Sequence, residues 1–210
     1  MPSRRTLLIM TCFFLVIAVA TPVRQPARAA TAASPEAFID SLAQAALKTI
    51  ANKTSSADRE AAFKVLLDDN FDVPRISRFV LGRYWSSASD ADKQRYLPLF
   101  ETYVVRAYSN RFSDYSGESV KVLGSRTQGD FVIVSSQIVQ PNGAPPIRVD
   151  WFVHQNGSDF RIADVSVDGV SMVLTEKQQF ASVMERDGKG VAGLNDVLTA
   201  KLAGKETALK

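Results

Sequence analysis

The strongest constraint on the fold is the stretch from residue 131 to residue 172, where three runs of strand-forming residues follow one another. The runs are FVIVSSQIV, IRVDWFVHQ and FRIADVSV, and they are separated by QPNGAPP and NGSD. Runs of this length that are bounded by Asn-Gly, Pro-Pro and Gly-Ser-Asp are typical of consecutive strands joined by turns. The stretch therefore predicts three neighbouring antiparallel strands, and a shorter run at about 119–124 predicts a fourth.

The middle run indicates which face of this sheet is apolar. Its apolar and polar residues alternate, with Ile147, Val149, Trp151 and Val153 in one phase and Arg148, Asp150 and His154 in the other. Successive side chains of a strand point to opposite faces of the sheet. One face is therefore apolar, and another part of the chain has to cover it.

Segments on both sides of the strands have the period of amphipathic helices. Before the strands, apolar residues recur at helical spacing over 34–51, 57–67, 73–81 and 89 to about 113. The last of these contains Pro98, which is expected to kink the helix. After the strands, Thr175 and Gln178 have the spacing of a capping box for a helix that ends near Gly188, and a final helix is predicted at about 193–202.

This order of elements predicts an α+β fold. We expect a four-stranded curved antiparallel sheet that helices cover on one face. Where the helices leave the concave face unfilled, the remaining space is an apolar pocket. No internal repeat, linker or low-complexity segment divides the chain, so residues 30–210 are expected to form a single domain.

The first 29 residues are predicted to be a signal peptide. Arg4 and Arg5 precede an apolar run from Leu7 to Ala20, and Ala27-Arg28-Ala29 has the small-x-small pattern of a cleavage site. A membrane anchor is the alternative, but the apolar run is shorter than the ~20 residues that span a bilayer. We therefore expect a soluble protein that is exported to the periplasm. The sequence leaves open whether the general secretory or the twin-arginine route exports it.

Removal of this segment changes the charge of the chain. The segment holds four arginines and no acid, so 21 Lys and Arg remain against 22 Asp and Glu. A basic surface for nucleic acid is therefore not expected. The segment also contains Cys12, the one cysteine of the sequence. Without it, thiol catalysis and cysteine-based metal sites are excluded.

Residues for catalysis or metal binding are scarce. The single histidine, His154, is expected to be a solvated side chain rather than a general base. The run Asp68, Asp69, Asn70 and Asp72 lacks the glycine and the distal glutamate of a calcium loop, so we expect a solvated turn in which Asp72 caps the next helix. Phosphate-binding glycine loops and zinc-binding spacings are absent from the sequence.

Three acids of the predicted sheet are a further candidate site. Asp150, Asp164 and Asp168 can form an acid pair or a metal site if they share one face. Arg148 and Arg161 lie on neighbouring strands, and cross-strand ion pairs are the favoured interpretation. We therefore predict no enzyme activity, no metal and no cofactor.

Four segments of the sequence resemble the MlaC family. They are 79–85 (FVLGRYW), the helix from Tyr103 to Tyr115, 141–150 (PNGAPPIRVD), and 164–172 with its ending DGVSM. This is the family of periplasmic lipid carriers that is also labelled toluene-tolerance auxiliary component, and it includes the hopanoid-associated HpnM branch. The similarity runs from about residue 35 to about residue 202.

The resemblance implies a soluble carrier that holds phospholipid acyl chains in a pocket. Such a carrier moves lipid between an outer-membrane lipoprotein complex and an inner-membrane ABC transporter complex, with phospholipid as its cargo and no cofactor. Two alternatives remain open at this stage. The cargo can be a hopanoid, or the chain can be a periplasmic adaptor protein whose own side chains fill the core.

The inward positions of the strands and helices, together with the resemblance, predict the residues that contact the lipid. For each of them, ordinary core packing is an equally open interpretation. The predicted set is Ile76, Val80, Tyr84, Phe100, Val104, Tyr108, Val134, Val149, Trp151, Val165 and Val167.

Overall fold

A computed structural model describes residues 34–51, 55–109, 117–186 and 188–204. All of them belong to one compact unit, Thr31–Lys210. The predicted signal peptide, residues 1–29, lies outside the described residues. None of the described helices has the length and apolar character needed to cross a bilayer.

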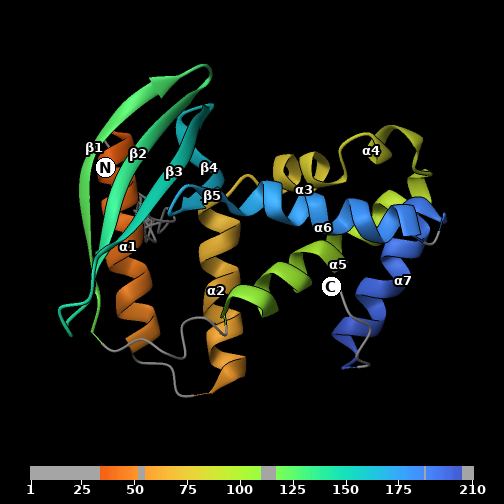
Figure 1. The fold of residues 1–210 in the computed structure, drawn as a ribbon, viewed down its shortest axis with the longest axis horizontal. Helices are drawn as coiled ribbons and strands as arrows, with labels where there is room; N and C mark the ends of the chain where they lie inside the picture. The colour runs from red at the N-terminus through yellow and green to blue at the C-terminus, as the bar shows by residue number, and fades with distance from the viewer. Residues whose placement is uncertain (1–33, 52–54, 110–116, 187, 205–210) are drawn as a thin grey trace, which may run out of the picture. The chain divides into compact units, whose positions relative to one another are not determined.

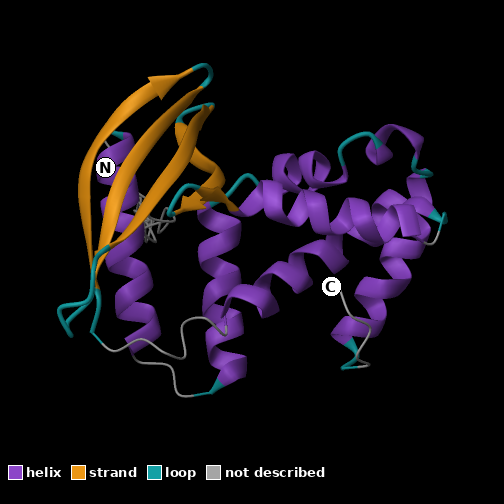
Figure 2. Cartoon of the chain, viewed as in Figure 1, coloured by secondary structure: helices purple, strands orange, loops and turns teal. Residues whose placement is uncertain are grey.

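The sheet is open, curved and antiparallel throughout, as Figures 1 and 2 show. Its strands lie in sequence order: β1 (Ser119–Gln128), β2 (Phe131–Val139), β3 (Ile147–Asn156), β4 (Asp159–Val167) and β5 (Val170–Ser171). The α+β fold and the antiparallel sheet are therefore confirmed. The fourth predicted strand is longer than expected because β1 continues to Gln128, and the two-residue strand β5 adds a fifth member.

Two bulges interrupt the strand pairing. In β1, Val122 and Gly124 pair with the adjacent residues Ser136 and Ser135, so Leu123 is an extra residue without a partner. In β4, Ala163 is extra, because Phe152 and Val153 of β3 pair with Asp164 and Ile162. A bulge bends its strand and increases the local twist. The two bulges therefore account for part of the curvature of the sheet.

The helices precede and follow the sheet. They are α1 (Pro35–Ala51), α2 (Ser56–Asn70), α3 (Val73–Leu81), α4 (Tyr84–Ser87), α5 (Asp90–Ser109), α6 (Met172–Arg186) and α7 (Gly190–Leu202). The expected cap of α3 is confirmed, since the Asp72 carboxylate accepts a hydrogen bond from the Arg75 backbone N–H at 3.1 Å. The short helix α4 was not predicted. The end of the predicted helix beyond Ser109 lies outside the described residues.

The predicted start of α6 at Thr175 is wrong. The helix begins at Met172, because the Ser171 hydroxyl accepts a hydrogen bond from the Leu174 backbone N–H at 3.0 Å. Thr175 lies inside the helix and donates its hydroxyl to the Ser171 carbonyl at 2.8 Å. The spacing of Thr175 and Gln178 thus imitates a capping box one turn too late.

Two apolar cores hold these elements together. In the first, α3, α5, α6 and α7 pack around Phe180, whose ring centre lies 5.5 Å from that of Tyr103 and 6.1 Å from that of Phe100. In the second, Ile39 and Leu42 of α1 pack against the sheet. Figure 1 shows α1 along the inside of the curved sheet. Phe71, which follows α2, contacts both cores.

We predict that the first core depends on Phe180, which is fully buried. Phe180→Ala should lower the free energy of unfolding by about 3–5 kcal/mol, because the ring leaves a cavity that its aromatic neighbours cannot fill. Leu174 lies on the same helix and is 49% exposed, so Leu174→Ala is the matched control and should change stability by less than about 0.5 kcal/mol. Urea unfolding measures both values, and similar losses in the two variants would contradict this description of the core.

Candidate functional site

An apolar cavity of about 330 Å³ lies among residues of both cores. This volume is at the lower end of the range for small-molecule pockets. Its wall is contributed by α2, α3, α5, α6 and the strands β2, β3 and β4. The lining residues are Phe63, Leu67, Phe71, Val73, Ile76, Val80, Phe100, Val104, Tyr108, Ile138, Trp151, Asp164, Val165, Val167, Met172, Val173 and Glu176.

Most of the predicted site residues lie in this wall. Those brought together are Ile76, Val80, Phe100, Val104, Tyr108, Trp151, Val165 and Val167. The structure places Tyr84, Val134 and Val149 outside it.

The three residues outside the wall are displaced by local structure. Gly82 ends α3 at a φ of +54°. Tyr84 comes after this break, so it does not lie on the same helix face as Val80 although it is four residues further on. Val134 faces the inside of the sheet but belongs to the core that Ile39 and Leu42 of α1 cover. Val149 is buried between its strand partners Ser136 and Val167.

The sequence contains a signal for some of the wall residues that the prediction omitted. Phe63 and Leu67 lie on the apolar face of the helix predicted at 57–67, and Ile138 is in the same strand phase as Val134. The two acids of the wall, Asp164 and Glu176, carry no such signal. Their side chains line an apolar cavity because of hydrogen bonds to residues distant in the sequence or across a turn.

Glu176 is the more deeply placed of these acids and is 8% exposed. Its carboxylate accepts a hydrogen bond from the hydroxyl of Tyr103 at 3.2 Å and from that of Tyr108 at 3.0 Å. Burial raises the pKa of the Tyr103 hydroxyl, and the nearby Glu176 charge raises it further. The carboxylate and the two tyrosines thus join α5 to α6 at the wall of the cavity.

Trp151 presents its ring to the cavity because its polar atom has a partner elsewhere. The indole N–H donates to the Ser136 hydroxyl at 2.9 Å, and that hydroxyl donates to the Val149 carbonyl at 3.2 Å. A buried indole N–H without such an acceptor would be costly. The indole N–H therefore has its hydrogen-bond acceptor within the strand pair β2–β3, and the apolar surface of the ring lies at the cavity.

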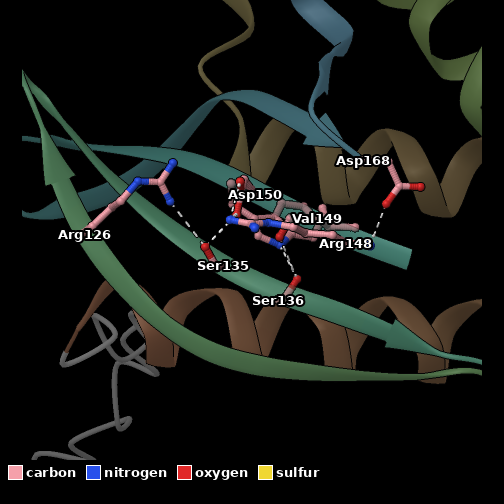
Figure 3. Close-up of polar contacts among 8 residues, drawn as sticks. Arg126, Ser135, Ser136, Arg148, Val149, Asp150 and Asp168 are labelled. Carbon is pink, nitrogen blue, oxygen red and sulfur yellow. Dashed lines mark hydrogen bonds and ion pairs between the residues drawn. The ribbon is translucent and has the colours of Figure 1, made fainter. Parts of the chain in front are cut away.

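The expectation of cross-strand ion pairs among the acids of the sheet is wrong. Arg148 pairs with Asp150 of its own strand at 3.3 Å. Asp150 also accepts a hydrogen bond from the Ser135 hydroxyl at 2.6 Å (Figure 3). Asp168 accepts from the Arg148 backbone N–H at 3.0 Å. Arg161 donates to the carbonyls of Asp68 and Asp69 at the end of α2.

The expectation of a solvated histidine is also wrong. The His154 side chain is 11% exposed, and its Nε2 lies 3.0 Å from a carboxylate oxygen of Asp72. Asp72 reaches this position because its backbone N–H donates to the Ile162 carbonyl at 2.9 Å, which holds the residue at the edge of β4. Among the described residues, no group of three acids, histidines or cysteines is arranged to hold a metal ion.

Comparison with known proteins identifies the family. The sequence model of the MlaC protein family matches residues 27–200. The chain belongs to the MlaC family. This match includes both cores, the cavity wall and every strand of the sheet.

Individual relatives are distant in sequence. The chain is 23% identical over 113 residues to the intermembrane phospholipid transport system binding protein MlaC of Haemophilus influenzae, and 23% identical over 129 residues to the toluene tolerance protein ttg2D of Pseudomonas putida. The matched segments cover 52% and 60% of this chain and span 53% and 60% of those relatives.

A solved structure matches over a longer part of the fold. It is the phospholipid-binding protein from Ralstonia solanacearum, which was determined in complex with a phospholipid. The two chains are 25% identical with a TM-score of 0.68, and the match covers 84% of this chain and 99% of the other.

We predict that the hydrogen bond from Tyr103 to Glu176 gives Tyr103→Phe a pH-dependent effect on stability. At neutral pH the variant should lose about 1.5–3 kcal/mol, because the carboxylate loses a hydrogen bond. The folded-state pKa of Tyr103 is raised. The contribution of the Tyr103 hydroxyl to the stability of the wild type is therefore fully present below the unfolded-state pKa of about 10, and it declines as the pH rises above that value.

The variant lacks this decline, so the difference between the two proteins should shrink above pH ~10. Urea unfolding of both proteins at neutral and at alkaline pH measures the difference. A difference that grows with pH would show that the Tyr103 hydroxyl is not held as a neutral donor to Glu176.

Proposed function

We propose that the chain is a lipid carrier that holds acyl chains in the cavity between the sheet and the helices. The observation that carries this proposal is the wall itself, which consists of aliphatic and aromatic side chains apart from Asp164 and Glu176. The phospholipid in the solved structure of the Ralstonia solanacearum relative supports it, since that relative matches this fold over nearly its whole length.

The physical basis of such binding is the removal of hydrocarbon from water. Each buried methylene contributes about 0.8 kcal/mol, so acyl chains are held without a charged group of the protein. The side chains proposed to contact them are those of the predicted set that lie in the wall: Ile76, Val80, Phe100, Val104, Tyr108, Trp151, Val165 and Val167. The polar headgroup then stays at the opening, in contact with water.

We further propose that the carrier works in the periplasm without enzymatic activity or a resident cofactor. In this role it accepts lipid from an outer-membrane lipoprotein complex and passes it to an inner-membrane ABC transporter complex, or moves it in the reverse direction. The name of the Haemophilus influenzae relative, an intermembrane phospholipid transport system binding protein, supports this place in lipid transport.

Extraction of the purified protein with organic solvent, followed by mass spectrometry, tests the cargo. We expect phospholipid at a fixed ratio to protein. A hopanoid in the extract would identify the alternative cargo. An extract without lipid, from protein purified without detergent, would favour an adaptor protein with a filled core.

We predict that Val167→Trp reduces the amount of extracted lipid while the protein keeps its thermal stability, because the indole occupies space in the cavity. Val134→Trp is the matched control. Val134 is fully buried outside the wall, so the same substitution there should cost about 1–3 kcal/mol through overpacking. A large loss of stability in Val167→Trp with unchanged lipid would contradict the proposed position of the acyl chains.

We also predict that the exported protein begins near Ala30. The arginines, the apolar run and the cleavage pattern of residues 1–29 are the basis for this expectation. N-terminal sequencing of protein from the periplasmic fraction determines the cleavage position. A retained Met1 in the membrane fraction would instead indicate an anchor.

A further inference from the structure

A second hollow, of about 690 Å³, lies on the opposite side of α3 from the lipid cavity. Ile76 and Val80 of this helix line the cavity, whereas Arg75, Arg78 and Phe79 line the hollow. Trp85, Leu97 and Lys177 also contribute to its wall. The two spaces therefore share a helix but have different side chains at their surfaces.

The hollow carries three cations. Arg75, Arg78 and Lys177 form no ion pair with any residue in the described part of the chain. The acid among its lining residues is Asp72, whose carboxylate lies 3.0 Å from His154 Nε2. The hollow is therefore a region of positive potential.

Aromatic rings hold these cations in place. The Lys177 ammonium lies 4.3 Å from the centre of the Phe79 ring, and the Arg78 guanidinium lies 5.8 Å from that of Trp85. The Arg75 guanidinium lies 5.2 Å from the centre of the Phe131 ring. A ring face orients a cation without neutralising its charge, so the N–H donors remain available to an anion.

Apolar side chains are exposed among the cations. Phe79 is 46% exposed and Leu97 is 39% exposed. Exposed aromatic and aliphatic side chains beside lysine and arginine are typical of surfaces that lie at the interface of a bilayer. At such an interface the phosphates form one layer and the acyl chains begin directly beneath it.

We propose that this hollow binds the surface of a bilayer that contains anionic phospholipids. The cations contact the phosphates, while Phe79 and Leu97 enter the layer beneath them. The proposal rests on the proposed function, because it assigns to the lipid carrier a surface that docks on a membrane containing its proposed partner complexes. An acidic segment of a partner protein matches the charge but supplies no apolar layer beneath its anionic groups, so the bilayer is the better fit.

Flotation with vesicles tests the proposal. The full mature protein is mixed with vesicles of phosphatidylcholine alone or of phosphatidylcholine with phosphatidylglycerol. We expect binding to the mixed vesicles, weaker binding at high salt, and little binding to phosphatidylcholine alone. Each cation near an anionic surface contributes roughly a factor of five to the partition coefficient, so Arg75→Gln with Arg78→Gln should weaken binding about 25-fold.

The matched control is Lys121→Gln with Arg126→Gln, which removes the same charge from the exposed strand β1. This control should bind the mixed vesicles nearly as well as wild type. If the double variant in α3 is poorly folded by circular dichroism, Lys177→Gln alone should weaken binding about fivefold.

Equal loss in the hollow variants and in the β1 control would overturn the proposal, as would equal binding to the two kinds of vesicle. Absence of vesicle binding together with salt-sensitive binding of a polyglutamate peptide to the hollow would overturn it in favour of a protein partner. Lipid extracted from each variant separates this result from the proposed function. Protein that keeps its lipid but does not bind vesicles contradicts only the proposed docking surface. Protein that contains no lipid contradicts the proposed carrier function.

Discussion

The carboxylate of Asp164 connects the sheet to the helices, and the position of the cavity depends on this connection. It accepts hydrogen bonds from the backbone N–H groups of Val165 at 2.8 Å and Val173 at 3.1 Å, and from the Ser171 hydroxyl at 2.5 Å. These groups belong to β4, to the first turn of α6 and to β5. Hydrogen bonds to a charged group contribute about 1.5–3 kcal/mol each, and a carboxylate at the start of a helix is further favoured by the helix dipole. One side chain thus determines where α6 leaves the sheet.

Much of the fold follows from local patterns that are visible in the sequence. The period of two in the middle strand placed Trp151 on the inner face, and the helical period placed Ile76 and Val80 toward the sheet. The bulge at Ala163 is the point at which the simple alternation fails. Because of this extra residue, Ile162 and Val165 both pack against the core on the inner face although they are three positions apart.

The residues that sequence patterns did not identify are those whose environment comes from distant parts of the chain. Glu176 lies in an apolar wall because Tyr103 and Tyr108 of α5 donate to it. His154 is shielded from water because the chain after α2 brings Asp72 to the edge of β4. An exposed polar residue is the better expectation for both from local sequence, since isolated buried charges are costly. Contacts with distant parts of the chain reverse that expectation: hydrogen bonds for Glu176 and the nearby Asp72 carboxylate for His154.

Gly82 lies at the end of α3, the helix whose residues line both the cavity and the hollow. It ends the helix at a φ of +54° with a ψ of −126°, a conformation that other residues rarely adopt. A Cβ at this position would also lie 3.0 Å from the Cε atom of Lys177, so glycine leaves room for the Lys177 side chain. This side chain places its ammonium over the Phe79 ring on the outer face of α3, while Ile76 and Val80 on the inner face line the cavity. Gly82 therefore ends the helix that the cavity and the hollow share, and it leaves room for one of the cations of the hollow.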